Sequence, residues 1–192
     1  MSTAAPSLRD RVAAAILDAA ASVLARPGGE QASMNDVALA AGLARATVYR
    51  YFPNRQALLD ELARRAVREA GDRLADAQLD DVPVEEALAR AVRALAAVGD
   101  RLVIVERERV RPEPAEFERA VVEPLSRLFD RGRAAGEIRT DVPTSSLGES
   151  LVGLVVSVLR STPSLGVEAT TALVARLFLD GARARAARPP ET

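Results

Sequence analysis

One short stretch of the chain, LARATVYRYF, concentrates side chains that can bind a polyanion. It contains Arg45, Thr47 and Arg50, together with Tyr49 and Tyr51, the only two tyrosines among 192 residues. A guanidinium can donate two hydrogen bonds to the edge of a guanine, and hydroxyl groups can bond to phosphate oxygens. The residue types therefore suit contact with nucleic acid, provided that a helix presents them on one side.

The charge around this stretch is positive although the charge of the whole chain is not. Arg45, Arg50 and Arg55 are the only charged residues between Val37 and Leu59, whereas the chain as a whole has a formal net charge of −1. For binding a polyanion, the placement of charge matters more than its sum.

Capping signals predict the helices that precede the stretch. Ser7 followed by Asp10 is a capping box that opens a first helix, which the sequence RPGG should end. Ser33 and Asp36 repeat the signal for a helix of about two turns, and Gly42 is suited to end it in a left-handed conformation.

A third helix should contain the stretch itself. Pro53 and Asn54 end it and begin a longer fourth helix that runs to about Gln78. The spacing of Val48 and Phe52 directs both toward a shared core. Two short helices joined by a tight turn form a helix-turn-helix, supported by the first helix and the start of the fourth.

The rest of the chain is also expected to be helical. Nearly half of the residues are apolar, with abundant Ala and Leu and few aromatics, which is typical of an all-α protein. Pro124 leaves two alternatives: it kinks one helix near Val122, or it is the first residue of a new helix, which we favour. Further helices are expected over residues 83–98, 100–110, 143–161 and 167–187.

Composition excludes several classes of activity. The chain has no cysteine and no histidine, which removes disulfides, thiolate and imidazole metal sites, and Ser-His or Cys-His catalysis. We expect no enzyme activity, metal or cofactor. The N-terminus lacks the pattern of a signal peptide, and the longest apolar run, residues 151–159, is too short to span a membrane, so a cytoplasmic location is expected.

Residues 8–62 resemble the N-terminal part of the TetR family of bacterial transcriptional regulators. The capped second helix, the glycine turn, the TVYRYF helix and the PNRQALL start of the fourth helix match the family pattern in register. Softer matches occur at residues 134–142 and 177–182.

The resemblance implies a helix-turn-helix DNA-binding domain over residues 1–53 and a helical effector-binding and dimerisation domain over residues 54–192, with the fourth helix shared. It implies a homodimeric regulator, a repressor that a small effector releases from operator DNA. The alternative is a helical module that binds lipid or another small molecule and carries a vestigial helix-turn-helix. This alternative is disfavoured because one side of the helix-turn-helix keeps residues suited to DNA binding: Arg45, Thr47, Tyr49 and Arg55.

Each expected DNA contact has its own role. Arg45 should read a base, and Thr47 should touch a phosphate or a thymine methyl. Tyr49 should bind phosphate more directly than Tyr51, which alternatively packs on the first helix. Arg55 stands where family members usually have a lysine that binds phosphate. The full expected set is Ser33, which also caps the second helix, Ala44, where many relatives have a hydroxyl, Arg45, Thr47, Tyr49, Arg50, Tyr51 and Arg55.

The larger domain offers mainly aliphatic side chains for a pocket, which favours an apolar effector. The charged run at residues 106–119 indicates a solvated face; a buried Arg107 or Arg109 that binds an anionic effector group is the alternative. The expected pocket residues are Leu95, Val98, Leu102, Phe117, Val121, Leu125, Val152 and Val155. The expected dimer interface consists of Leu147, Leu151, Leu154, Val158, Leu173, Leu177 and Phe178.

Overall fold

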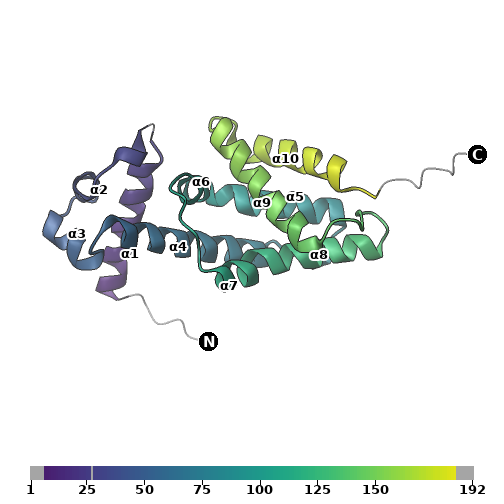
Figure 1. The fold of residues 1–192 in the computed structure, drawn as a ribbon, viewed down its shortest axis with the longest axis horizontal. Helices are drawn as coiled ribbons and strands as arrows, with labels where there is room; N and C mark the ends of the chain where they lie inside the picture. The colour runs from purple at the N-terminus through teal and green to yellow at the C-terminus, as the bar shows by residue number, and fades with distance from the viewer. Residues whose placement is uncertain (1–6, 27, 185–192) are drawn as a thin grey trace, which may run out of the picture. The chain divides into compact units, whose positions relative to one another are not determined.

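The computed structural model describes residues 7–26 and 28–184, and within these ranges the chain is helical, as composition predicted. The α-helices in chain order (Figure 1) are α1 (Leu8–Leu24), α2 (Met34–Ala40), α3 (Arg45–Tyr51), α4 (Arg55–Asp76), α5 (Val84–Val98), α6 (Asp100–Arg107), α7 (Pro114–Phe117), α8 (Glu123–Ala134), α9 (Thr144–Ser161) and α10 (Gly166–Ala182). Short turns η1 (Gly29–Gln31) and η2 (Leu79–Asp81) are 3₁₀-helical, and η3 (Glu118–Val122) is π-helical.

The chain divides into two compact units, and the division falls inside α4. The N-terminal unit consists of Met1–Ala66 and Asp100–Pro112, and the C-terminal unit of Val67–Gly99 and Glu113–Thr192. The sequence suggested domains of residues 1–53 and 54–192, with the fourth helix shared between them.

Packing explains why α6 and the first part of α4 belong with the helix-turn-helix. Leu58 and Leu62 of α4 and Ile104 of α6 lie in the same buried cluster as Ile16 of α1 and Val48 of α3. The sequence pattern identified these residues as apolar but could not show that a helix fifty residues downstream joins the core.

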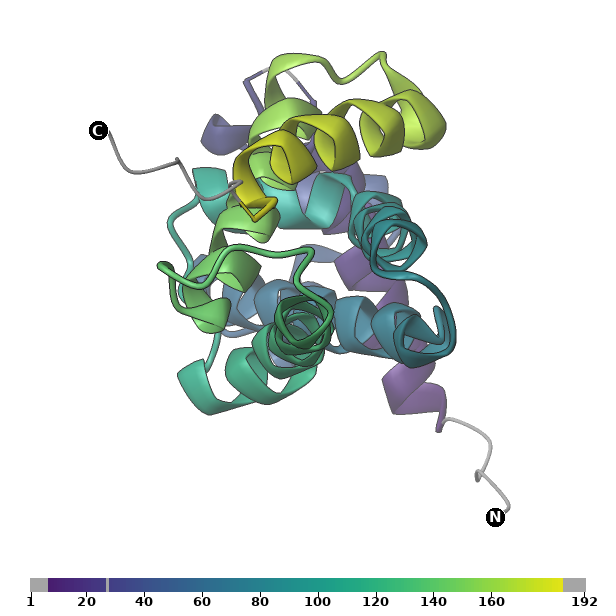
Figure 2. The ribbon, with the colours of Figure 1, turned by 90° about the vertical axis from the view of Figure 1, so that its right-hand side faces the viewer.

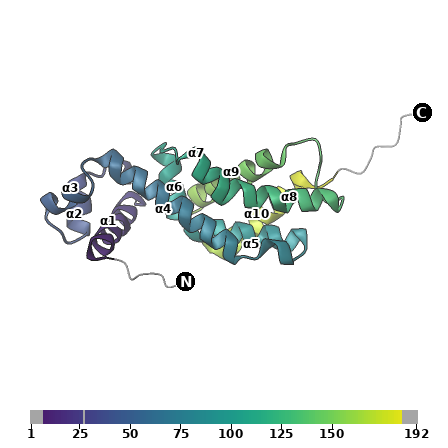
Figure 3. The ribbon, with the colours of Figure 1, turned by 90° about the horizontal axis from the view of Figure 1, so that it is seen from below.

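Both predicted capping boxes of the N-terminal unit are present. The Ser7 hydroxyl accepts from the Asp10 backbone N–H while the Asp10 carboxylate accepts from the Ser7 N–H, and Ser33 and Asp36 form the same reciprocal pair. Gly42 has a φ of +66°, the left-handed turn expected between α2 and α3. Figure 3 shows the resulting sequence of α1, α2 and α3 within this unit.

The C-terminal unit is built around α5, which packs on α8, α9 and α10. Figure 2 shows α10, in yellow, at the face of this unit where it packs on α5 and α9. The rings of Phe129 in α8 and Phe178 in α10 lie 5.5 Å apart between centroids. The predicted last helix extends to about Ala187, and the part beyond residue 184 lies outside the described residues.

Pro124 stands in the first turn of α8, as the favoured alternative expected, but the preceding η3 runs into α8 without a break in the helical backbone. The backbone remains right-handed helical at Glu118, Val122 and Glu123, and the Glu123 N–H donates to the carbonyl of Glu118, five residues back. A π-turn therefore precedes Pro124, which stands in the first turn of α8. Such a turn accommodates a residue that has no N–H to donate.

Among the described residues, no helix has both the length and the apolar character needed to cross a membrane.

Candidate nucleic-acid interface

Helix α3 buries one face and leaves its arginines outside. Val48 is fully buried and Phe52, just after the helix, is 6% exposed, as their spacing predicted. Arg45 and Arg50 are exposed and Thr47 is half-buried. Ala44 takes the N-cap position without a side-chain hydrogen bond. The free N–H groups at this end of α3 thus remain available to an outside acceptor.

Each tyrosine of this region supports one arginine. The guanidinium carbon of Arg45 lies 5.2 Å from the ring centroid of Tyr49, and that of Arg50 lies 5.6 Å from the ring centroid of Tyr51. Arg45 Nη2 also donates to the Tyr49 hydroxyl at 3.4 Å. Both rings are half-buried and pack on the core of the N-terminal unit. This packing of the rings restricts the conformations of the two arginines that lie against them.

The hydroxyl of Ser33 is committed to Asp36, with 2.6 Å between Oγ and Oδ2. Hydrogen bonds from the Ser33 side chain and backbone hold the pKa of the Asp36 carboxyl below its usual value. A depressed pKa means that the cap contributes stability at neutral pH, and that this contribution is lost only as the pH falls through the lowered pKa. The direct DNA contact of Ser33 stays a prediction.

The guanidinium of Arg55, for which the sequence predicted a phosphate contact, makes three contacts within the protein. Nη1 pairs with Glu108 Oε2 at 2.9 Å, while Nη2 and Nε donate to the carbonyls of Glu30 and Ala32 at 3.1 and 3.3 Å. No local pattern signals the pair, because 53 residues separate Arg55 from Glu108.

Comparison with known proteins agrees with this geometry. The family model described as "Bacterial regulatory proteins, tetR family" matches residues 16–62, from the buried part of α1 into α4. The chain is also 37% identical over 126 residues to the HTH-type transcriptional repressor LfrR of Mycolicibacterium smegmatis, a match that covers 62% of this chain and 66% of LfrR. The chain belongs to the TetR family.

Further relatives extend the similarity beyond the helix-turn-helix. The crystal structure of LfrR in complex with proflavine superposes with a TM-score of 0.77 over 91% of this chain and 98% of that chain, at 26% identity. The uncharacterized HTH-type transcriptional regulator Rv1255c of Mycobacterium tuberculosis is 37% identical over 86 residues, 44% of this chain and 43% of that protein. The chain thus spans about two thirds or less of the length of these curated relatives in sequence. They are named as regulators and not as enzymes, in agreement with the expectation from composition.

Most of the residues that the sequence suggested for a pocket are buried in the structure of this TetR family member. Of the eight expected wall residues, Leu95, Val98, Val121, Leu125 and Val155 are at most 2% exposed, and Leu102, Phe117 and Val152 are half-buried. Leu102 belongs to the N-terminal unit. Apolar spacing identified core positions correctly but could not distinguish a closed core from the wall of a cavity.

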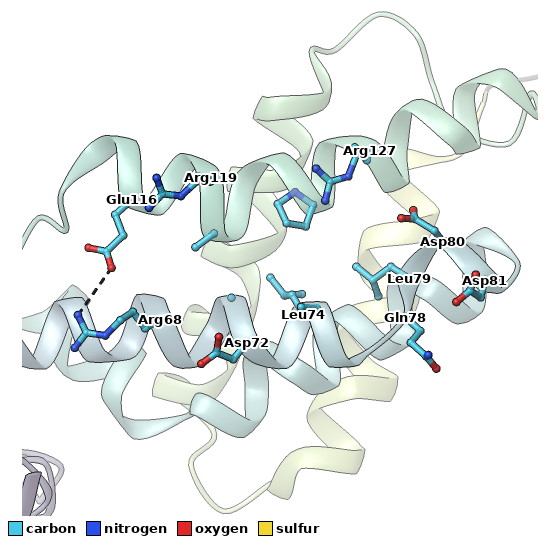
Figure 4. A pocket seen from close by; sticks show the side chains of 14 residues that line it. Arg68, Asp72, Leu74, Gln78, Leu79, Asp80, Asp81, Glu116, Arg119 and Arg127 are labelled. Carbon is cyan, nitrogen blue, oxygen red and sulfur yellow. Dashed lines mark ion pairs between the residues drawn. The ribbon is translucent and has the colours of Figure 1, made fainter. Parts of the chain in front are cut away.

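A cleft of about 660 Å³ lies instead between the second half of α4 and the segment from α7 to α8 (Figure 4). An ion pair spans it, with 3.9 Å between Arg68 and Glu116 (Figure 4). Its lining is mainly polar and charged: Arg68, Gly71, Asp72, Leu74, Ala75, Gln78, Leu79, Asp80, Asp81, Glu116, Arg119, Ala120, Pro124 and Arg127.

Each wall of the cleft carries charges of both signs, since Arg68 shares the α4 wall and Glu116 shares the opposite one. Asp72 on α4 and Asp81 on η2 stand on one side, and Arg119 and Arg127 stand on the other (Figure 4). The side chains of Leu74 and Leu79 are buried at its base. This arrangement suits a ligand that has charges of both signs and an apolar body.

Nη2 of Arg107 donates to the carbonyl of Leu24 at the end of α1, so this guanidinium has a partner within the N-terminal unit. Arg109 is exposed, in a left-handed conformation with φ of +53°.

The residues of the expected dimer interface differ in their exposure to solvent. Four of them are buried within the single chain: Leu147, Leu151, Val158 and Phe178. Leu154 and Leu173 are half-buried, and Leu177 is 50% exposed. A dimer interface at these residues stays a prediction, and Leu177 is the most exposed of them.

Proposed function

We propose that this chain is a homodimeric transcriptional repressor that binds operator DNA through α3 and is released by a small effector. The observation that carries the proposal is the surface of α3, where Arg45 and Arg50 are held against tyrosine rings on a helix without acidic residues. The name of the relative LfrR, a transcriptional repressor, supports the same role.

A gel shift with DNA from directly upstream of the gene for this chain tests the proposal. Arg45→Ala should relax sequence preference and weaken cognate binding by about 1–3 kcal/mol, since arginine near the start of a recognition helix reads guanine. Arg160→Ala, an exposed arginine on α9, is the matched control and should bind like the unmodified chain. Loss of affinity without loss of base preference in Arg45→Ala would contradict base reading.

For the effector, the cleft supports a dipolar molecule with an apolar body in place of the purely apolar one expected from sequence. Proflavine, found in the LfrR complex, is a planar aromatic cation and a suitable first probe. Rhodamine B is zwitterionic, and its ethyl ester lacks the carboxylate. The two dyes therefore separate the contribution of an anionic group from that of the cationic body.

Fluorescence titration should show rhodamine B binding about fivefold more tightly than its ethyl ester, a difference of the size expected for one partly exposed ion pair. Arg119→Gln or Arg127→Gln should remove this preference, and Asp72→Asn should weaken all three dyes. Glu149→Gln, at an exposed position of α9, serves as the control. Equal binding of both rhodamines to every variant would exclude the cleft as their site.

A further inference from the structure

Arg55 lies where the chain leaves the helix-turn-helix, and two of its three bonds reach back to where the chain enters it. The carbonyls of Glu30 and Ala32 that it binds come just before Ser33, the cap of α2. Arg55 itself is the first residue of α4. One side chain therefore ties both ends of the segment that contains α2 and α3.

Glu108 orients this side chain. Its carboxylate is only 9% exposed, whereas the Arg55 side chain is 34% exposed. The second oxygen of Glu108 lies 4.0 Å from Nη2 of Arg107, and among the described residues it accepts no hydrogen bond. A shielded carboxylate between two guanidinium groups fixes their positions more strongly than an exposed surface pair, because removing it leaves cations with no counterion.

Helix α6 is joined to the same region by two of its arginines. Arg107 donates to the carbonyl of Leu24, where α1 ends, and Arg101 pairs with Asp18 of α1 at 3.2 Å. Together with the Arg55 pair, these contacts join the segment 101–108 to α1, to the entry of α2 and to the start of α4, all within the N-terminal unit.

We infer that Arg55 and Glu108 are positioning residues for DNA binding: Glu108 holds the Arg55 guanidinium in its fork of carbonyl contacts, and this clasp fixes the orientation in which α2 and α3 meet DNA. The inference rests on the proposed DNA-binding function. In this inference Arg55 makes no contact with phosphate. A positive charge at residue 55 is therefore not enough to maintain DNA affinity. A lysine would keep the charge but cannot supply three donors in a planar fork.

The test compares Arg55→Lys, Arg55→Gln, Glu108→Gln and the double variant Arg55→Gln/Glu108→Gln with the unmodified chain. The probe is a duplex selected by the unmodified chain from a randomised library, and its affinity is measured over a series of salt concentrations. Circular dichroism checks that each variant is folded, and titration with excess duplex gives the fraction of protein that can bind DNA. Glu86→Gln, which breaks an exposed pair with Arg90 in the C-terminal unit, is the control.

Each of the three single variants at Arg55 and Glu108 should weaken DNA binding about tenfold with an unchanged salt slope, and the double variant should be no weaker than either. A phosphate contact predicts a different result: Arg55→Lys would bind normally and Arg55→Gln would lower the salt slope by about one unit. Either of these outcomes would contradict the positioning role of Arg55. Normal DNA binding by Glu108→Gln would show that Glu108 does not contribute to that role. If the unmodified chain enriches no duplex, the proposed function itself fails, which is a different result from normal binding by the variants.

Discussion

Leu151→Asp should unfold the C-terminal unit, whereas Leu177→Asp should leave the chain folded and dissociate the proposed dimer. Leu151 is fully buried in the chain's own core, and Leu177 on α10 is 50% exposed. A carboxylate at residue 151 would be buried without an ion-pair partner. We therefore expect a loss of more than about 4 kcal/mol in the free energy of unfolding. At residue 177 the carboxylate is hydrated in the monomer and is buried only if a partner covers it.

Sedimentation and thermal unfolding followed by circular dichroism distinguish these two effects. The unmodified chain should sediment as a dimer at micromolar concentration, and Leu177→Asp as a folded monomer. Asp180→Asn, an exposed neighbour on the same helix, provides a control that should stay dimeric. A folded, dimeric Leu177→Asp protein would show that this part of α10 is not the interface, and a normally folded Leu151→Asp protein would contradict the burial of Leu151.

The parts of the fold that the sequence predicted well are those set by neighbouring residues. Ser33 and Asp36 cap α2 because a hydroxyl and a carboxylate three residues apart reach each other's backbone N–H. The inward direction of Val48 follows from helical periodicity in the same way. The N-terminal helices could therefore be placed within a residue or two.

The parts that could not be predicted depend on residues far apart in the chain. Arg55 looked like a surface cation because its partner Glu108 lies on a segment whose packing against α1 has no local signal. The same limitation applies to Leu151 and Phe178. Helical periodicity marks a residue as inward, but it does not say whether the covering surface belongs to the same chain or to a second copy.

Pro124 illustrates a third case, in which the local rule was correct but had two solutions. A proline inside a helical pattern must lose one backbone hydrogen bond. The chain responds with a π-turn at Glu118–Val122, which keeps the helix continuous and brings Arg119 and Arg127 to the same cleft. The choice depends on packing: Val122 and Leu125 on either side of the proline are fully buried.

Gly29→Ala should disrupt the N-terminal unit far more than Gly28→Ala, although the two glycines are adjacent. A β-carbon on Gly29 would lie 2.3 Å from the carbonyl oxygen of Leu24 and 2.8 Å from that of Val23. Both are backbone atoms, which cannot rotate away, so we expect a loss of about 3 kcal/mol or more. Gly28 has a φ of +78° with no atom within 4 Å of the added carbon, so alanine there meets only left-handed strain of about 1–2 kcal/mol.

The chain carries its own reporter for this comparison, because its two tyrosines lie on α3 and it has no tryptophan. Urea unfolding followed by tyrosine fluorescence therefore reports on the N-terminal unit, while circular dichroism reports on all helices. Gly29→Ala should lower the tyrosine midpoint strongly and also weaken DNA binding, since displacing η1 moves the Glu30 carbonyl that Arg55 binds. Gly28→Asn, which tolerates the left-handed conformation, should be milder than Gly28→Ala. Equal midpoints for Gly28→Ala and Gly29→Ala would mean that η1 can move away from α1 at little cost, and the clasp at Arg55 would then be too loosely anchored to orient α2 and α3.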